Sequence, residues 1–233
     1  MFLEKLQPKM FLFENVRGLL THDRGKTYAT MLEIFANTGY TIVKKVLNAW
    51  DYGAPQKRER LITIGIRNDL VDKTEYRFPE PHEYKPVLRD VLLDCPEGPG
   101  VPYGEKKRKI FELVPPGGYW RDINPEVAKE YMKSCWNMEG GRTGILRRMS
   151  LDEPSLTVLT SPSQKQTERC HPLEARPFTV RENARCQTFP DEWQFCGSVQ
   201  SQYKQVGNAV PVNLAYETVS YTHLRAHETG AYL

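Results

Sequence analysis

Residues 40–66 decide the fold, and they read YTIVKKVLNAWDYGAPQKRERLITIGI. Tyr40–Leu47 and Leu61–Ile66 are rich in β-branched side chains, which pack well on a pleated sheet, so we expect both segments to be strands. Between them, Asp51–Pro55 contains the glycine and proline that are typical of a turn. The stretch therefore predicts two strands joined by a short connection.

Two segments that precede this stretch add a helix and a further extended run. Thr27–Asn37 places its large apolar residues where they suit one face of a helix, and Gly39 follows as a stop signal. Met10–Phe13 is a continuous apolar run that leads into Glu14-Asn15-Val16. Helical and extended segments thus alternate over residues 1–80, which predicts an α/β fold class.

The composition is that of a globular chain with a core of its own. Of its 233 residues 39% are hydrophobic, and 32 Lys and Arg against 29 Asp and Glu give a net charge of only +3, which does not by itself indicate a nucleic-acid binder. The longest stretch without a charged residue, Gln205–Tyr216, is far shorter than the roughly 20 apolar residues that span a bilayer, so no membrane segment is expected. Five cysteines without a Cys-x-x-Cys pair argue against a disulfide framework, and the charged N-terminus argues against a signal peptide. We expect a cytoplasmic protein.

The character of the chain changes near residues 80 and 175. Residues 81–174 are irregular and rich in proline and glycine, which leaves few positions for long helices or strands. The last segment, from about residue 175, again carries helix signals. The sequence therefore predicts two ordered segments with an irregular region between them.

The helix signals of the third segment are specific. Thr179 and Glu182 have the spacing of a capping box, in which each side chain satisfies a free backbone amide at a helix start, and Pro190 is expected to stop that helix. Asn208 is a good N-cap residue and Pro211 is tolerated in a first turn, so a second helix is expected to open at Gly207–Pro211.

Four strings, in this order along the chain, resemble the late motifs of the cytosine-5 DNA methyltransferases. The strings are Phe13-Glu14-Asn15-Val16, Gln56-Lys57-Arg58-Glu59-Arg60, Arg176–Glu182 with Gln187–Pro190, and Tyr203–Pro211. The resemblance implies a partial Rossmann-like methyltransferase sheet and an irregular, mostly β and loop, target-recognition region. It assigns residues 1–80 to the catalytic domain, 81–174 to target recognition and 175–219 to a segment that returns to the catalytic domain, while 220–233 does not look like family sequence.

The resemblance also implies an activity. Enzymes of this family transfer a methyl group from S-adenosylmethionine to carbon 5 of cytosine in double-stranded DNA, here in the manner of a restriction-modification system, after flipping the base out of the duplex. By the motif match, Glu14 would hydrogen-bond ring nitrogen 3 and the exocyclic amine, Arg60 would hold the exocyclic oxygen, and Arg58 would order the phosphate of the flipped nucleotide. The cofactor side would include Asn208, Ala209 and Val210.

Cations and amides in the middle region are candidates for contacts with DNA. Glycines there permit close approach of the backbone, and arginines can reach phosphates or guanine edges, two roles that the sequence does not rank. Lys106–Lys109 is either a solvated rim or a phosphate contact, and the amides after residue 160 are either contacts or an ordinary polar loop. The candidate DNA-binding residues are Arg142, Arg147, Arg148, Gln164 and Arg169.

The sequence also departs from the family pattern. Members of the family place a glycine-rich cofactor loop and a Pro-Cys loop before Glu-Asn-Val, and neither is found in this sequence. We therefore expect the C-terminal part of an enzyme, which is inactive alone and has an N-terminal half as partner. We also expect Met10–Phe13 to form an unpaired sheet edge. The alternatives are a non-catalytic DNA-binding half of a split methyltransferase and, less favoured, an RNA cytosine methyltransferase. His223 and His227 have helical ligand spacing but no third partner, so no metal site is expected.

Overall fold

The chain forms two compact units. The computed structural model describes residues 2–73, 76–140, 142–162 and 164–228. The first unit comprises the residues up to Tyr52, Arg58–Glu83 and the residues from Asn213 onward, and the second comprises Gly53–Lys57 and Tyr84–Val212. The short segment Gly53–Lys57 thus belongs to the second unit, although the residues before and after it belong to the first.

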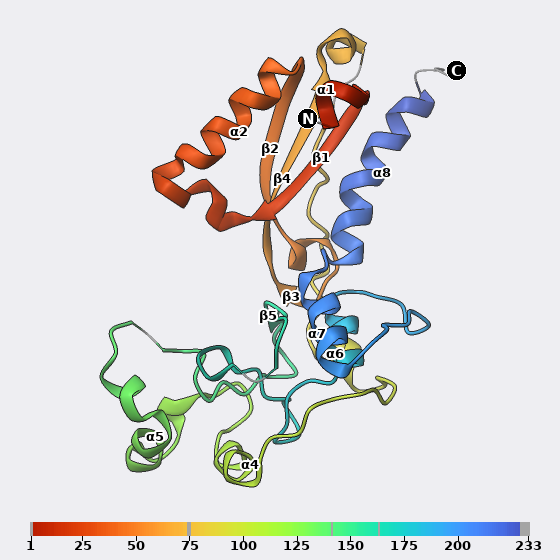
Figure 1. Ribbon diagram of the computed structural model, residues 1–233. Helices are drawn as coiled ribbons and strands as arrows, with labels where there is room; N and C mark the ends of the chain where they lie inside the picture. Colours follow the sequence, from red (N-terminus) through yellow and green to blue (C-terminus); the bar gives the residue numbers. More distant parts are fainter. Residues whose placement is uncertain (1, 74–75, 141, 163, 229–233) are drawn as a thin grey trace. The chain divides into compact units, whose positions relative to one another are not determined.

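A three-stranded antiparallel sheet organises the first unit (Figure 1). Its strands are β1 (Met10–Val16), β2 (Tyr40–Asn48) and β4 (Glu59–Arg67), in the order β1-β4-β2. The predicted strands are confirmed, and β4 is nearly continuously buried because it is central. Among the described strands β1 pairs only with β4, so the expected unpaired edge is confirmed for the described part of the chain.

Helix α2 (Lys26–Asn37) packs on one face of this sheet. The Phe11 ring lies 5.0 Å from Phe35 of α2 and 5.1 Å from Tyr40 of β2. Gly65 stands opposite Phe11 in the register, and a Cβ there would lie 2.0 Å from the Phe11 ring, so only glycine leaves room for it. As predicted, the helix stops before Gly39, whose φ of 92° is in the left-handed region.

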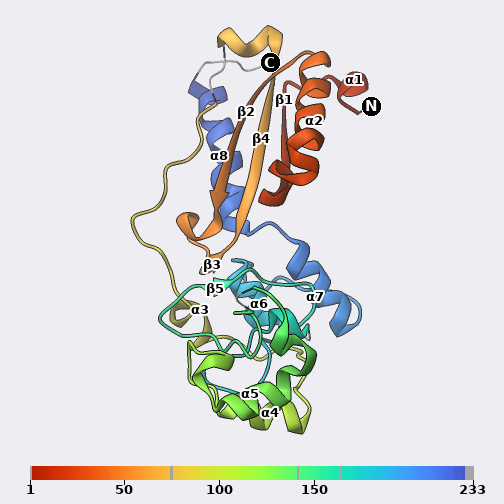
Figure 2. The same cartoon turned by 90° about the vertical axis from the view of Figure 1, so that its left-hand side faces the viewer.

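Helix α8 (Val212–Glu228) lies on the other face of the sheet, and Figures 1 and 2 both show the sheet between α2 and α8. The Tyr76 hydroxyl donates to the Thr218 carbonyl at 3.1 Å, which ties the segment after β4 to this helix. A short helix, α1 (Phe2–Leu6), precedes β1, and the 3₁₀ turns of this unit are η1 (Arg17–Leu20), η2 (His22–Gly25), η3 (Ala49–Tyr52) and η4 (Asn68–Lys73). No helix in the described residues is long and apolar enough to cross a bilayer.

The second unit is built from short helices and loops around two hydrophobic clusters. One cluster includes Phe178, Tyr203 and Val206, and the other includes Phe111 and Met132. Its helices are α3 (Arg89–Leu92), α4 (Glu105–Glu112), α5 (Pro125–Met132), α6 (Val180–Cys186) and α7 (Val199–Asn208), with the turns η5 (Trp120–Asp122), η6 (Lys133–Asn137) and η7 (Lys165–Thr167). The paired strands β3 (Gln56–Lys57) and β5 (Ser155–Leu156) are parallel and only two residues long.

Two helix boundaries differ from the prediction. The capping box at Thr179 is confirmed, but α6 ends at Cys186, well before Pro190, because Thr188 adopts a left-handed φ of 58°. Asn208 does not open a helix: it is the last residue of α7, and α8 begins at Val212. Pro211 has no N–H to donate one turn back, so the helix that starts at Val199 cannot continue through it.

The compact units also divide the chain differently from the predicted segments. Residues 175–212, predicted to return to the catalytic domain, group with the middle region, and only the chain from Asn213 onward groups with the sheet. The predicted tail begins inside α8, and the side chains of His223 and His227 lie outside those described. Catalytic and target-recognition roles for these parts remain predictions.

Candidate active site

The pair Glu14 and Arg60, on which the sequence interpretation depends, is brought together by the register of β1 and β4. Glu14 lies opposite Ile62, and Val16 lies opposite Arg60, so Glu14 and Arg60 are diagonal neighbours on one face. The Arg60 Nε and a Glu14 carboxylate oxygen are 2.7 Å apart. The predicted partners therefore form a close ion pair.

The site is accessible from the β1 side of the sheet. The Glu14 side chain is 26% exposed and that of Arg60 11%. The residues two before and two after Glu14 share its face, and both are exposed: Leu12 at 43% and Val16 at 52%. A half-buried charge pair thus lies between two apolar side chains, a setting that suits a flat ring with polar edges.

Arg58 lies deeper than its predicted role requires. Only 2% of it is exposed, its N–H donates to the Asn48 side-chain oxygen at 3.1 Å, and its carbonyl accepts from Ala49 N–H at 3.0 Å. Burial, and then the charge of Arg60, lower the pKa of Arg58 to about 10, while Glu14 opposes the shift. This placement suits a residue that supports Glu14 and Arg60, and the phosphate contact remains a prediction that its burial disfavours.

The predicted cofactor residues lie at the end of α7. Asn208 is exposed, and Ala209 and Val210 are half-buried. The Ala209 carbonyl accepts from the Gln187 side chain at 3.1 Å, which fixes the backbone here. An exposed amide beside two small apolar side chains can contact a nucleoside-like molecule, but the geometry does not by itself identify one.

The candidate DNA-binding residues do not form one group. Arg148 donates to three backbone carbonyls, which gives it a structural role. Arg142 donates to the carbonyls of Cys135 and Trp136 and lies over the Trp120 ring. Gln164 is exposed, and Arg147 and Arg169 are half-buried with few partners. DNA contact by these residues remains a prediction.

The basic run Lys106–Lys109 lies on α4, and every one of its cations has a carboxylate partner. Lys106 pairs with Glu130 at 3.2 Å, Arg108 with Glu112 at 2.7 Å and Lys109 with Glu105 at 2.7 Å. Lys107 pairs at 2.6 Å with the fully buried Glu168. The structure favours the interpretation of a solvated and internally paired helix over that of a phosphate contact.

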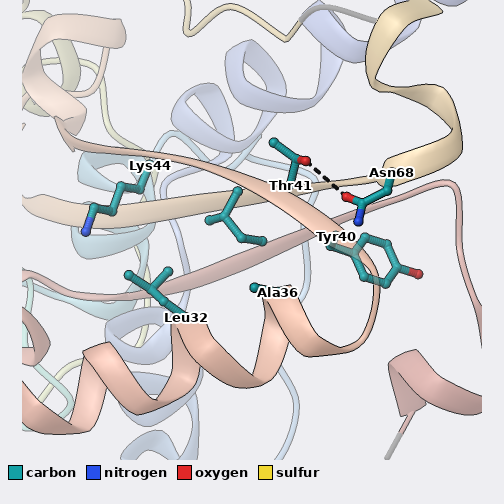
Figure 3. A pocket seen from close by; sticks show the side chains of 7 residues that line it. Leu32, Ala36, Tyr40, Thr41, Lys44 and Asn68 are labelled. Carbon is teal, nitrogen blue, oxygen red and sulfur yellow. Dashed lines mark hydrogen bonds between the residues drawn. The ribbon is translucent and has the colours of Figure 1, made fainter.

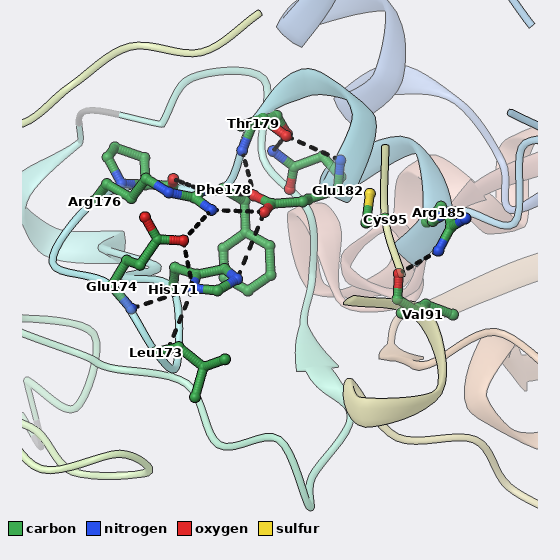
Figure 4. A network of polar contacts seen from close by, with 12 residues as sticks. Val91, Cys95, His171, Leu173, Glu174, Arg176, Phe178, Thr179, Glu182 and Arg185 are labelled. Carbon is green, nitrogen blue, oxygen red and sulfur yellow. Dashed lines mark hydrogen bonds and ion pairs between the residues drawn. The ribbon is translucent and has the colours of Figure 1, made fainter. Parts of the chain in front are cut away.

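The predicted capping box of α6 belongs to a larger polar network, and the rest of that network was missed at the sequence level (Figure 4). The Arg176 guanidinium donates to both carboxylate oxygens of Glu182 at 2.8 Å, and Glu182 also accepts from Thr179 N–H at 2.7 Å. The His171 Nδ1 accepts backbone N–H groups, so the proton of its neutral ring lies on Nε2, 3.5 Å from Glu182. Burial lowers the pKa of His171, which keeps it neutral. Its signal in the sequence was a lone His-Pro pair, too common to interpret.

A second missed feature is a buried pair of glutamines from two of the quoted motifs. The Gln56 side chain donates to the Gln187 side-chain oxygen at 2.9 Å and accepts from Val158 N–H at 2.8 Å. Gln187 in turn donates to the Val206 carbonyl at 2.7 Å. Both glutamines are fully buried, and they link three segments of the second unit.

The first unit also has an open groove of about 490 Å³ beside the edge strand β2 (Figure 3). Leu32 and Ala36 of α2 line one side, and Thr41 and Lys44 line the other. Lys44 lies opposite Thr63, on the α2 face of the sheet, whereas Glu14 and Arg60 lie on the opposite face. The groove is therefore separate from the candidate active site.

The cysteines have the character expected of structural residues. Cys170 and Cys186 are fully buried, and burial raises the pKa of Cys170 to about 12 and that of Cys95 to about 11. A thiol held in its neutral form is a poor nucleophile. Cys196 is exposed and Cys135 is partly exposed. The predicted role of the five as structural or incidental residues stays a prediction.

Comparison with known proteins identifies the family. The profile of the C-5 cytosine-specific DNA methylases matches residues 1–222. The chain belongs to this family. It is 57% identical over 215 residues to the type II methyltransferase M.Sau96I of Staphylococcus aureus, and 51% identical over 221 residues to M.Eco47II of Escherichia coli. Each match covers 91% of this chain but only 50% and 53% of the relative, so the chain spans about half their length.

Solved structures agree with this family on the fold. A prophage-encoded E. coli protein assigned as a DNA modification methyltransferase superposes with a TM-score of 0.67 at 20% identity, over 97% of this chain and 72% of the other. A methyltransferase of Entamoeba histolytica gives 0.58 at 16% identity, over 95% and 63%. The predicted family and the predicted partial methyltransferase fold are both confirmed.

Proposed function

We propose that the protein to which this chain belongs transfers a methyl group to carbon 5 of cytosine in a specific sequence of double-stranded DNA, as a modification enzyme of the restriction-modification type. The observation that supports this most directly is the Glu14–Arg60 pair, 2.7 Å apart on the accessible side of β1. Two residues matched by separate motifs meet on one face, as binding of a single base requires.

Each partner has hydrogen-bonding capacity beyond their mutual contact. A carboxylate accepts at two oxygens, and a guanidinium donates from five N–H groups. Glu14, as a carboxylic acid, would donate to ring nitrogen 3 of the flipped cytosine, which has a lone pair and no hydrogen, and would accept from the exocyclic amine, while Arg60 would donate to the exocyclic oxygen. The exposed Leu12 and Val16 would cover the faces of the ring near Glu14. Arg58 would hold both charged groups in place from beneath.

S-adenosylmethionine is the proposed methyl donor, since methyltransferases generally use it, and it would supply an activated methyl group when bound. Asn208 would contact it through its exposed amide, and Ala209 and Val210 through their short apolar side chains. Gln187 would keep this segment in place through its bond to the Ala209 carbonyl. Cytoplasmic location and inactivity of the isolated chain remain predictions from the sequence.

Methylation of host DNA tests the proposal. Bisulfite sequencing of DNA from cells that express the protein containing this chain should find methylated cytosines at one recurring sequence. Glu14→Gln and Arg60→Gln should each lower the methylated fraction at least about 100-fold. Glu59→Gln is the matched control, since Glu59 is exposed and pairs with Arg17 at 2.9 Å. Methylation that survives both site variants would refute the assignment.

A DNA-binding half of a split enzyme remains the alternative, and it is compatible with the outer edge of β1, with which no other strand pairs in the described part of the chain. An edge strand with exposed Leu12 and Val16 can pair with a strand from the same polypeptide or from another chain. The two cases differ in the reading frame upstream of the Met1 codon. One continuous frame supports a single enzyme, and a separate frame for the missing motifs supports a split one.

A further inference from the structure

Two extended segments of the second unit set arginines side by side. Arg148 and Cys170 form a parallel β-bridge, and the Cys170 N–H donates to the Arg147 carbonyl at 3.0 Å. Successive side chains of an extended backbone point to opposite faces, and paired strands lie about 4.8 Å apart. Arg147 and Arg169, which each precede a bridged residue, therefore lie abreast on the face opposite to Arg148 and Cys170.

Arg148 makes three hydrogen bonds within the protein. Its guanidinium donates to the carbonyls of Val114 at 2.9 Å, Pro172 at 3.2 Å and Phe111 at 3.3 Å. Cys170 is completely buried beside it. Arg148 therefore holds loops of this unit together.

The opposite face carries the positive charges of Arg147 and Arg169, and the Arg147 guanidinium lies over the Tyr119 ring, 5.8 Å from its centroid. Among the described residues, the Nε atoms of Arg147 and Arg169 are buried without a hydrogen-bond partner. The nearest carboxylate of Arg147 is that of Glu153, at 3.9 Å and half-exposed. Arg169 donates to the Glu168 backbone carbonyl at 2.8 Å, which is a neutral partner.

The Glu168 carboxylate, although adjacent in sequence, does not neutralise this pair. It is fully buried, where Lys107 lies at 2.6 Å, the Tyr131 hydroxyl at 2.5 Å and the Leu146 N–H at 2.6 Å. Burial, and then the charge of Arg147, lower the pKa of Arg169 to about 10. Arg169 therefore lies close to a second positive charge, in a partly desolvated setting that disfavours its own charge.

We propose that Arg147 and Arg169 jointly bind one backbone phosphate of DNA, whereas the adjacent Arg148 takes no part in binding. The proposal rests on the proposed function, since it requires a DNA ligand, and it deepens that function by assigning the phosphate contact. A shared anion would neutralise both half-buried guanidiniums and accept an N–H group from each. A guanine edge offers neutral acceptors only, so it would leave the mutual repulsion in place.

The salt dependence of DNA binding tests this. The 233-residue chain is titrated with a fluorescein-labelled duplex at a series of KCl concentrations, and the logarithm of the affinity is plotted against that of the salt concentration. Because both arginines share one phosphate, the double variant Arg147→Gln with Arg169→Gln should lower the magnitude of the slope by about 1. Neither single variant should lower it by more than the double variant does. Arg147→Lys should keep the slope, and Arg108→Gln, a surface cation of α4, is the matched control.

Several results would overturn the proposal. A double variant that loses about 2 in slope would indicate two separate phosphates. A double variant with an unchanged slope that no longer prefers one duplex sequence over another would indicate guanine contacts. Failure of the unmodified chain to bind duplex DNA would also count against the proposal. Thermal denaturation guards against misfolding: the single variants should keep the melting temperature, whereas Arg148→Gln should lower it. DNA binding with the expected slopes but without methylation in cells would refute the proposed function alone.

Discussion

Removal of Glu14 should cost more stability than removal of Arg60, although the two residues form one ion pair. Arg58 and Arg60 both feel the Glu14 charge, and each is destabilised by burial. Glu14→Ala leaves two half-desolvated guanidiniums without their carboxylate, whereas Arg60→Ala leaves Glu14 with the charge of Arg58. Loss of Glu14 thus affects two guanidiniums, whereas loss of Arg60 affects one carboxylate.

The geometry sets the size of the effect. At 2.7 Å, an effective dielectric constant near 20 gives a gross attraction of about 6 kcal/mol, of which desolvation of the two groups offsets more than half. We expect Glu14→Ala to lower the local free energy of unfolding by about 3 kcal/mol, Arg60→Ala by about 2 and the double variant by about 3. The coupling energy is then about 2 kcal/mol.

Peptide-resolved hydrogen exchange of β1 and β4, followed as a function of urea, measures this free energy within the first unit. The four proteins of the double-mutant cycle are compared at pH 7 and low salt. A coupling energy below about 0.5 kcal/mol would show that the pair contributes no more than an exposed one. Equal costs for the two single variants would refute the claim that Arg58 depends on Glu14.

Four further outcomes are expected in the second unit. Gly207→Ala should lower the free energy of unfolding by about 2 kcal/mol, since its Cβ would lie 2.5 Å from a neighbouring backbone, whereas Gly104→Ala, with open space around it, should change the melting temperature little. Gln187→Leu removes three buried side-chain hydrogen bonds and should cost about 3 kcal/mol in chemical denaturation; a cost under about 1 would contradict that. In the native protein at pH 8, a thiol reagent should modify Cys196 while sparing Cys170. Because the pKa of Cys170 is raised in the folded state, its contribution to stability is complete below pH 9 and is lost as the pH rises toward about 12, so the urea midpoint should fall over that range.

The elements of the first unit could be predicted from sequence because their signals are local. β-branched runs at 40–47 and 61–66, an apolar helix face at 27–37 and a stop at Gly39 each act within a few residues, and the structure follows them. The meeting of Glu14 and Arg60 is not local, since it depends on the register that sets Glu14 opposite Ile62. Motif resemblance predicted that meeting, whereas residue patterns alone could not.

The second unit was less predictable because backbone partners, not side-chain periodicity, hold it together. Arg147 and Arg148 are identical residues at adjacent positions, and nothing in the sequence separates them. The bridge between Arg148 and Cys170 separates them in the structure, because it places Arg148 beside three carbonyls and Arg147 on the opposite face. The start of the last helix was misplaced: Asn208 has the residue type of an N-cap, but it is the last residue of α7, and α8 begins only after Pro211.

Arginines of the second unit differ in the carboxylates that lie beside them. Arg176 is held by two carboxylates, those of Glu174 and Glu182. Arg147 has the Glu153 carboxylate at 3.9 Å, and the neighbouring Arg169 donates to a neutral backbone carbonyl. Two positive charges close together repel each other, and a polyanionic ligand would offset that repulsion. If DNA is that ligand, its presence should raise the melting temperature of the unmodified chain, and this gain should shrink when Arg147 and Arg169 are both replaced by glutamine.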